Sequence, residues 1–287
     1  MTIARFEAFA TVVELGSFTK AAEHLNMTQS AVSHAIASLE SEWGTTLFIR
    51  DRKKGIFLTE VGQKTIVHMR EILNRMETIR QEVTLASKLE VGTIHIGTFA
   101  SASACLLPKI LSKFQRKHPN IEFRFYEGTY EEIAEWLHTG VVDIGFVVQQ
   151  DSPAPFDMIP LAKDEMVVAF SAHHKLAAEV TVPIRALKDE PFIMPTGMYR
   201  AHVQALFRQE KIAPNIRFEV HDCNTIANMV QEGLGVTIGP ALFLKTQPNI
   251  QVRHLDVKHW RTVSLACLSI PESSPAVKAF LSVAENV

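Results

Sequence analysis

Residues 18–40, FTKAAEHLNMTQSAVSHAIASLE, have the pattern of two short helices joined by a tight turn. Apolar residues recur at positions i, i+3, i+4 and i+7 in each half, which places each set on one helix face. The two sets are Phe18, Ala21, Ala22 and Leu25, then Val32, Ala35, Ile36 and Leu39. Ser17 and Thr28 stand where N-caps belong, and Asn26 suits the left-handed conformation that ends a helix.

The outer face of the second helix carries short, polar and mostly uncharged side chains: Gln29, Ser30, Ser33, His34 and Ala37. A face exposed only to water would more often carry Lys and Glu. Short hydrogen-bonding groups are what a helix needs to reach base edges in a DNA major groove. The pattern therefore predicts a helix-turn-helix with Thr28–Glu40 as its recognition helix, although a helical hairpin in an ordinary core has the same periodicity.

The segments around residues 18–40 extend this interpretation to a winged helix-turn-helix. Residues 3–16 predict a supporting helix that ends at Gly16, and residues 46–49 and 56–58 predict two short strands. Between these strands lies a basic tip that would place cations beside the phosphate backbone or in the minor groove. Its residues are Arg50, Arg52, Lys53 and Lys54. The alternative is a solvated charged turn.

Residues 16–63 closely resemble the N-terminal signature of LysR-type transcriptional regulators. The family pattern is an alanine pair, a leucine, T-Q-S/P-A-V-S, L-F-x-R and L-T-x-x-G. This chain matches it with Ala21-Ala22, Leu25, Thr28-Gln29-Ser30-Ala31-Val32-Ser33, Leu47-Phe48-Ile49-Arg50 and Leu58-Thr59-Glu60-Val61-Gly62. The family usually has Arg at the position of His34, so the resemblance implies a weaker or pH-dependent DNA contact there.

Length and composition set the class of protein. A chain of 287 residues is long enough for two or three domains, and 47% hydrophobic with 21% charged residues is typical of a soluble globular protein. The sequence contains neither an apolar run long enough to span a membrane nor an evident secretion signal. Cys105, Cys223 and Cys267 form no C-x-x-C pair, which argues against disulfides and zinc and favours a cytoplasmic location.

Charge alone does not indicate nucleic-acid binding. The formal net charge is −2, whereas a basic balance is the simple expectation for a DNA-binding protein. Within residues 1–60, six Lys and Arg residues face seven Asp and Glu residues. Four of those six bases lie in residues 50–54, so the positive charge is concentrated at the expected wing.

Residues 60–88 have a long helical pattern that favours pairing with a second copy of the chain. One apolar stripe is Ile66, Met69, Leu73, Met76 and Val83, and its flank is Ile72, Ile79 and Ala86. Arg80 interrupts a strict heptad register, and packing against the chain's own C-terminal region is the alternative. The predicted domains are a DNA-binding domain at 1–59, a dimerisation helix at 60–90 and an effector-binding domain at 91–287.

From residue 92 onward strands and helices alternate, which predicts α/β units with parallel sheets. We expect helices near residues 104–116, 131–138, 199–209, 225–232 and 275–285, and strands near residues 93–97, 122–126, 142–148, 166–170, 192–194, 216–220, 236–238 and 263–268. This region resembles the effector-binding part of the same family, and the resemblance implies the two-lobed α/β fold of periplasmic solute-binding proteins. We expect lobe I at 91–161 and 268–287 and lobe II at 162–267. The chain would cross between the lobes near residues 159–163 and 265–268.

Ligands of open α/β sheets bind beyond the carboxyl ends of strands, often at helix N-termini. This rule selects as effector-binding candidates Thr98, Ser101, Ala102, Ser103, Thr129, Gln149, Pro195, Thr196, His221, Asn224 and Thr225. Hydroxyls and amide donors suit a small anion, and the resemblance implies that effectors are often small carboxylates. Ser103, Thr129 and Thr225 have a simpler alternative role as helix caps.

Other chemistry finds little support in the sequence. Glu219, His221 and Cys223 share one face of an expected strand, a spacing seldom used for zinc. The glycines of residues 233–239 run from a helix into a strand, the reverse of a dinucleotide loop. No nucleophile motif or paired carboxylates stand out. We therefore expect no catalytic residues, no metal site and no cofactor, and thus no enzyme.

These observations predict a cytoplasmic transcriptional regulator that binds double-stranded operator DNA and is modulated by a small-molecule effector between two lobes. Its other expected partners are itself, as a homodimer or homotetramer, and RNA polymerase if it is an activator. No membrane partner is expected. Two alternatives stay open: a two-lobed small-molecule binder or enzyme with an N-terminal oligomerisation module, and a regulator that senses redox state through Cys223.

Overall fold

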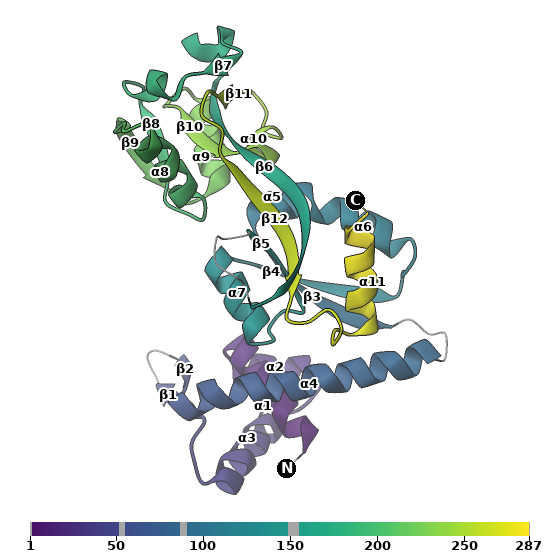
Figure 1. The fold of residues 1–287 in the computed structure, drawn as a ribbon. Helices are drawn as coiled ribbons and strands as arrows, with labels where there is room; N and C mark the ends of the chain where they lie inside the picture. Colours follow the sequence, from purple (N-terminus) through teal and green to yellow (C-terminus); the bar gives the residue numbers. More distant parts are fainter. Residues whose placement is uncertain (1, 52–54, 87–90, 149–154, 287) are drawn as a thin grey trace. The chain divides into compact units, whose positions relative to one another are not determined.

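The computed structural model describes residues 2–51, 55–86, 91–148 and 155–286 (Figure 1). The chain divides into two compact units, each described here by itself. Unit 1 comprises Met1–Gly92 with His138–Val141, and unit 2 comprises Thr93–Leu137 with Val142–Val287. No helix among the described residues is long and apolar enough to cross a membrane.

Unit 1 is a three-helix core followed by a β-hairpin and a long helix. Its elements are α1 (Ile3–Leu15), α2 (Phe18–His24), α3 (Gln29–Trp43), β1 (Phe48–Asp51), β2 (Gly55–Leu58) and α4 (Glu60–Ala86). The apolar faces expected from the sequence meet in one cluster, where Phe9, Ile36 and Leu47 are fully buried. The rings of Phe9 and Phe48 lie 4.8 Å apart and join the hairpin to the helices.

The predicted N-caps of α2 and α3 are confirmed, whereas α3 continues to Trp43, beyond the expected end at Glu40. The Ser17 side chain accepts a hydrogen bond from the Lys20 amide, and Thr28 accepts one from the Ala31 amide. Asn26 has a φ of 54°, so it adopts the left-handed conformation expected between α2 and α3. Caps of this kind stabilise a helix by about 1 kcal/mol each, and here they fix where α3 begins.

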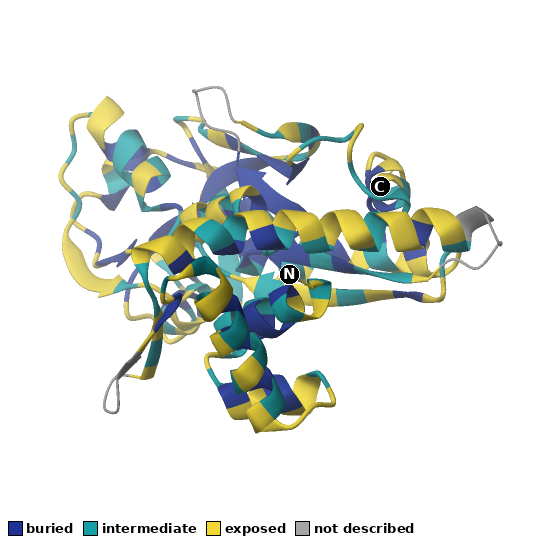
Figure 2. Cartoon of the chain, turned by 90° about the horizontal axis from the view of Figure 1, so that it is seen from below, coloured by how far each residue is buried: buried dark blue, intermediate teal, exposed yellow. Residues whose placement is uncertain are grey.

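The apolar residues of α4 divide into an intramolecular set and an exposed set. Ile66 and Met69 are buried in the unit 1 core, and Leu73 packs against it. The apolar stripe that remains for pairing with a second copy is therefore narrower than predicted, because the residues in the first turns of α4 pack inside unit 1. The apolar residues left exposed on α4 include Ile72, Met76, Ile79 and Val83. Figure 2 shows exposed positions recurring along the described part of this helix.

Unit 2 has two lobes that share one sheet (Figure 1). The elements of the first lobe are β3 (Gly92–Thr98), α5 (Ala100–Cys105), α6 (Leu107–Gln115), β4 (Ile121–Glu127), α7 (Tyr130–His138), β5 (Ile144–Val148) and α11 (Pro275–Ala284). The single helix expected over 104–116 is two helices, because α5 ends at Cys105 and Pro108 lies in the first turn of α6.

The second lobe contains the remaining strands and helices. They are β7 (Thr181–Val182), β8 (Phe192–Pro195), α8 (Arg200–Gln209), β9 (Ile216–Val220), α9 (Cys223–Gln231), β10 (Thr237–Pro240), α10 (Ala241–Leu244) and β11 (Ile250–Leu255), with the short 3-10 turns η1 (Lys175–Ala178) and η2 (Ile184–Leu187). Two long strands, β6 (Asp157–Ser171) and β12 (Trp260–Cys267), connect the lobes.

The sheet topology corrects the expectation of parallel sheets. The strand order is β4-β3-β5-β12-β6-β11-β7, with β10 also paired to β6. β6 pairs with β12 over residues 157–165 and with β10 and β11 over residues 166–171, always antiparallel. The chain leaves the first lobe along β6 and returns along β12, so these neighbours run in opposite directions. Parallel pairing is found between β3 and β5, β8 and β9, and β7 and β11.

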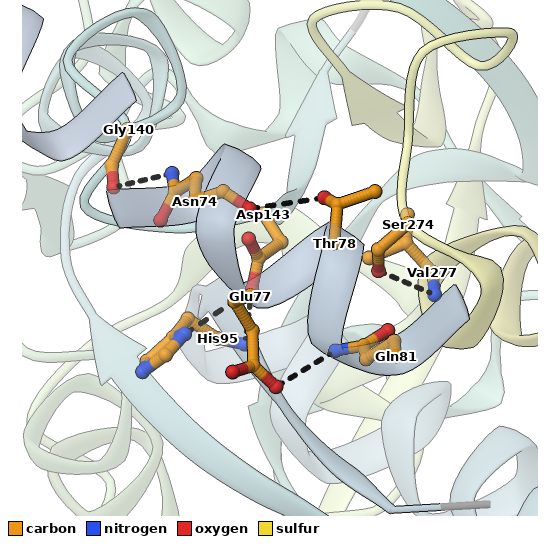
Figure 3. Close-up of polar contacts among 9 residues, drawn as sticks. All are labelled: Asn74, Glu77, Thr78, Gln81, His95, Gly140, Asp143, Ser274 and Val277. Carbon is orange, nitrogen blue, oxygen red and sulfur yellow. Dashed lines mark hydrogen bonds and ion pairs between the residues drawn. The ribbon is translucent and has the colours of Figure 1, made fainter. Parts of the chain in front are cut away.

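Polar contacts at the ends of strands and helices complete each unit (Figure 3). In unit 2, Asp143 Oδ2 accepts a hydrogen bond from the His95 amide at 2.8 Å, which joins β3 to the segment that leads into β5. In unit 1, the Asn74 side chain of α4 donates to the Gly140 carbonyl at 3.3 Å. These contacts orient the start of β5 and the middle of α4.

Candidate nucleic-acid interface and ligand site

The face of α3 selected from the sequence is exposed in the structure. Gln29, Ser30, His34 and Ala37 are exposed and Ser33 is half-buried, whereas Val32, Ile36 and Leu39 on the opposite face are completely buried. Thr28 caps the helix, and its hydroxyl lies 3.0 Å from that of Ser30. A well-packed helix therefore presents short polar groups outward, as readout of base edges requires.

Arg5 of α1 lies beside this face, which sequence patterns did not indicate. It lines an open surface depression together with His34, Ala37, Ser38, Ser41 and Glu42. Arg5 Nη1 donates to Glu42 Oε2 at 2.9 Å. The sequence could have pointed to Arg5 through its rarity, because Arg5 and Lys20 are the only Lys or Arg residues among residues 1–49.

The predicted wing is an antiparallel hairpin in which Asp51 pairs with Gly55. Its expected phosphate contacts Arg52, Lys53 and Lys54 lie outside the described residues. Arg50 is in β1 opposite Ile56, and its side chain also lies outside the described part. The position of the hairpin after α3 is the one expected for a winged helix.

In unit 2, Arg261 of β12 joins one predicted candidate, Ser101, to two residues that the sequence patterns did not indicate, Tyr130 and Asp164. Its guanidinium donates to Asp164 Oδ2 from Nε at 3.0 Å and from Nη2 at 2.8 Å. It also donates to the Ser101 hydroxyl at 2.7 Å and to the Tyr130 hydroxyl. Arg261 is 3% exposed and Asp164 2%, so this charge pair is sealed from water. We call Arg261, Asp164, Ser101 and Tyr130 the Arg261 cluster.

The Arg261 cluster is tied to elements on both sides. Asp164 Oδ1 accepts a hydrogen bond from the Leu242 amide of α10 at 2.9 Å, and the Cys105 thiol donates to the Leu242 carbonyl. The Arg261 guanidinium lies 5.5 Å from the centre of the Phe99 ring. Buried charges persist only when paired and hydrogen-bonded, and this network satisfies that condition.

The candidates after β3 fall into the first lobe, next to the Arg261 cluster. The hydroxyls of Thr98 and Ser103 lie 3.0 Å apart, whereas the Ser101 hydroxyl accepts from Arg261. Ala102 is fully buried. The amides of Ala102 and Ser103 both donate to the Phe99 carbonyl, so these expected free amides are used within the helix.

The candidates of the second lobe lie together because β8 and β9 are parallel neighbours. Pro195 pairs with Val220, and the Thr196 amide donates to the Val220 carbonyl at 2.9 Å. The next residues, Gly197 and His221, approach so closely that a Cβ on Gly197 would lie 3.2 Å from the His221 carbonyl oxygen. Thr196 and His221 are exposed at this shared strand end.

Of the suggested helix caps Thr129 and Thr225, the structure supports Thr129 alone. Thr129 is a cap, because its hydroxyl accepts from the Glu132 amide while Glu132 accepts from the Thr129 amide. Thr225 is not a cap. Its amide and hydroxyl donate to Asp222 Oδ1, so Asp222 caps α9 and these bonds lower the pKa of the Asp222 carboxyl. Asn224 is exposed nearby, and Gln149 lies outside the described residues.

Cys223 is in an environment that disfavours a reactive thiolate. Burial raises the pKa of the Cys223 thiol, although a hydrogen bond from the Tyr199 hydroxyl lowers it. Burial and the neighbouring Cys223 also raise the pKa of Tyr199. Redox sensors need a low thiol pKa and access to solvent, so this geometry does not favour the redox alternative.

Metal ligands are not gathered in the part of the chain that the structure describes. No group of three or more His, Cys, Asp or Glu side chains could hold an ion there, and Glu219 instead pairs with Arg200 at 2.9 Å. His202 and His259 lie 2.9 Å apart, from Nδ1 to Nε2. Burial, His259 and Arg261 lower the pKa of His202 to about 4, so the ring is neutral at neutral pH.

Comparison with known proteins places both units in one family. Residues 3–63 match the model for the bacterial regulatory helix-turn-helix protein of the lysR family, and residues 87–287 match the LysR substrate binding domain. An uncharacterized HTH-type transcriptional regulator, YvbU of Bacillus subtilis strain 168, is 39% identical over 100% of this chain and 99% of its own length. The probable HTH-type regulator LrrA of Synechococcus elongatus is 32% identical over 99% of this chain and 96% of its own length.

Solved structures share the fold along the whole chain. A full-length OxyR variant from Pseudomonas aeruginosa has a TM-score of 0.78 and 23% identity, covering 99% of this chain and 94% of its own. Full-length CbnR complexed with its target DNA has a TM-score of 0.71 and 21% identity, covering 100% of this chain and 99% of its own. With an N-terminal helix-turn-helix and a two-lobed C-terminal domain matched in full, the chain belongs to the LysR family of transcriptional regulators.

Proposed function

We propose that this regulator reads operator DNA with α3, using Gln29, Ser33 and His34 on base edges. Ser30 lies on the same exposed face, and the phosphate contacts would come from Thr28, Arg50, Arg52, Lys53 and Lys54. The observation that carries the proposal is the exposed, nearly uncharged face of a helix whose opposite face is completely buried. Such a helix is held rigidly while its outer groups stay available to a groove.

The exposed apolar residues of α4 support assembly with a second copy of the chain. Ile72, Met76, Ile79 and Val83 recur at spacings of four, three and four residues, the a/d pattern of a two-stranded coiled coil. A soluble monomer rarely exposes such a stripe. A dimer, or a dimer of dimers, would present paired recognition helices to paired half-sites.

We propose that a small molecule bound in unit 2 modulates this activity. The supporting observation is the shared end of the parallel strands β8 and β9, where Thr196 and His221 are exposed. Because Asp164 already neutralises Arg261, a carboxylate effector would rely on other donors. The carboxyl ends of β8 and β9, with Thr196, His221 and Asn224, are the candidates. Binding would shift the balance between lobe arrangements.

We place the protein in the cytoplasm as a regulator without enzymatic activity. If it activates transcription, RNA polymerase would be a further partner. These assignments rest on the family to which the chain belongs. An oligomerisation role for the N-terminal unit without DNA binding is the competing proposal.

A double substitution tests the recognition helix. Gln29→Ala with Ser33→Ala should abolish the specific complex with DNA taken from around the protein's own gene, measured by gel shift and footprinting. Sedimentation should show unchanged dimerisation. Gln63→Ala, an exposed residue in the first turn of α4, is the matched control. A footprint that survives the double substitution would show that α3 is not the reading helix, and a wild-type chain without salt-sensitive specific binding would favour the competing proposal.

A further inference from the structure

Arg5 is a cation beside α3 whose role the recognition-helix proposal leaves open. The depression that it lines includes His34, Ala37 and Ser41, which lie at i, i+3 and i+7 on α3. All three are exposed, so this row continues the face that carries Gln29 and Ser30 toward the C-terminal end of the helix. Arg5 therefore flanks the surface of α3 that would face a groove.

The Arg5–Glu42 ion pair is exposed enough to be exchanged. The side chain of Arg5 is 29% exposed and that of Glu42 41%, with 2.9 Å between Nη1 and Oε2. Ion pairs in such exposed positions contribute little to stability. A guanidinium can form bidentate hydrogen bonds with a phosphate as well as with a carboxylate. If the Arg5 guanidinium left Glu42 to bind a phosphate, the stability of the folded chain would therefore change little.

Glu42 has the opposite effect on DNA, since its carboxylate would repel a nearby phosphate. Without DNA, Arg5 neutralises this charge and is itself held beside α3. The packing of α1 on α3 depends little on the pair, because Phe6, Phe9 and Val12 already bury α1 against Ile36 and Leu39 in the same core.

We propose that Arg5 contacts a phosphate in the DNA interface, and that its guanidinium leaves Glu42 for the duplex when DNA binds. In this proposal the Glu42 carboxylate lowers the affinity of the chain for DNA of any sequence. This inference rests on the proposed placement of α3 at the groove. It adds a contact with the DNA backbone from α1, outside the helix-turn-helix and the wing, in a stretch (residues 1–49) that has two Lys or Arg residues.

Fluorescence anisotropy of the full chain with a labelled duplex of mixed sequence, titrated over a range of salt concentrations, tests this role. Arg5→Gln should weaken binding about 10-fold and reduce the salt dependence by about one released counterion. Arg5→Lys should retain most of the salt dependence. Glu42→Gln should strengthen binding several-fold without reducing the salt dependence. The matched controls are Arg185→Gln and Glu210→Gln, an ion pair in unit 2, which should change nothing.

Two results would overturn the inference. One is an unchanged salt dependence in Arg5→Gln. The other is equal weakening by Arg5→Gln and Glu42→Gln accompanied by a lower Tm in both, which would show that the pair only joins α1 to α3. If the wild-type chain binds no duplex at all, the proposed function fails together with the inference. If it binds and only the Arg5 results fail, the inference alone is wrong.

Discussion

The recognition face of α3 and the Arg261 cluster treat polar groups in opposite ways. The α3 face comes from one continuous stretch, is exposed and is almost uncharged. The Arg261 cluster draws Ser101, Tyr130, Asp164 and Arg261 from distant parts of the chain, and its charges are sealed from water. A surface that reads DNA keeps its hydrogen-bonding groups free for the partner. Charges in a buried site must instead pair with other groups of the same chain, and the stability of the fold then depends on those pairs.

The largest expected effect is on the buried pair. Asp164→Ala would leave the Arg261 guanidinium buried without its counter-charge, which should lower the free energy of unfolding by about 3–5 kcal/mol. Chemical denaturation of the full chain measures this. Glu210→Ala, which removes a partner from the exposed pair with Arg185, should cost less than about 1 kcal/mol. Similar losses in both variants would mean that burial does not distinguish the two pairs.

The next effect concerns the exposed apolar stripe of α4. Ile79→Glu should raise the dimer dissociation constant about 100-fold or more, because a carboxylate would be buried at the interface. Sedimentation equilibrium gives the dissociation constant. Val180→Glu places the same charge on another exposed apolar residue, in unit 2, and should leave it unchanged. An unchanged dimer in Ile79→Glu would move the interface away from α4.

Acidification should weaken unit 2 through His202. The folded pKa of about 4 lies below the usual 6.5, so the fold favours the neutral ring. Its stabilisation is complete above pH 6.5 and is lost as the pH falls toward 4. For this half-buried ring we expect a loss of about 1 kcal/mol between pH 7 and pH 5, measured by urea unfolding.

A variant that lacks the titrating ring isolates the His202 contribution. His202→Gln should flatten the decline in stability between pH 7 and pH 5, whereas His173→Gln, at an exposed position in the same lobe, should keep it. An identical pH profile in His202→Gln and the wild-type chain would assign the decline to other groups.

The smallest effect is expected at the N-terminus of α9. Asp222→Ala removes the acceptor of the Thr225 amide and hydroxyl and should cost about 1 kcal/mol of stability, whereas Asp222→Ser should restore most of it. Thermal unfolding provides the comparison. No difference between the Ala and Ser variants would show that the cap contributes little here.

The difference between the two sites also explains what could be predicted from sequence. The helices, caps and exposed face of residues 17–43 depend on local spacing, and Asn26 and Thr28 show the expected conformations. Asp164 and Arg261 are separated by nearly a hundred positions, and no periodic pattern connects them. Their signal was charged residues at the edge of an apolar strand, and the partner that each charge finds is decided by topology.

The same limit applies to the strands of unit 2. The sequence patterns do not predict β11, and they predict β6 only over residues 166–170 although it begins at Asp157. Pro160 and the charges at residues 163–165 hide the strand character of that first half. It forms because β12 supplies a partner over its full length, which is a tertiary effect that propensity cannot anticipate.

The paired strands β6 and β12 also limit how the two lobes can move. Strands hydrogen-bonded across the junction resist swinging open like loops, because opening would break the ladder between them. A rotation about their common axis stretches these bonds little. The register shift between Val263 and Ser264 is the place where the ladder is already interrupted and where twist can accumulate. Under the proposed effector binding, a small molecule held in unit 2 would act on the two lobes through torsion, with small angles rather than large translations between them.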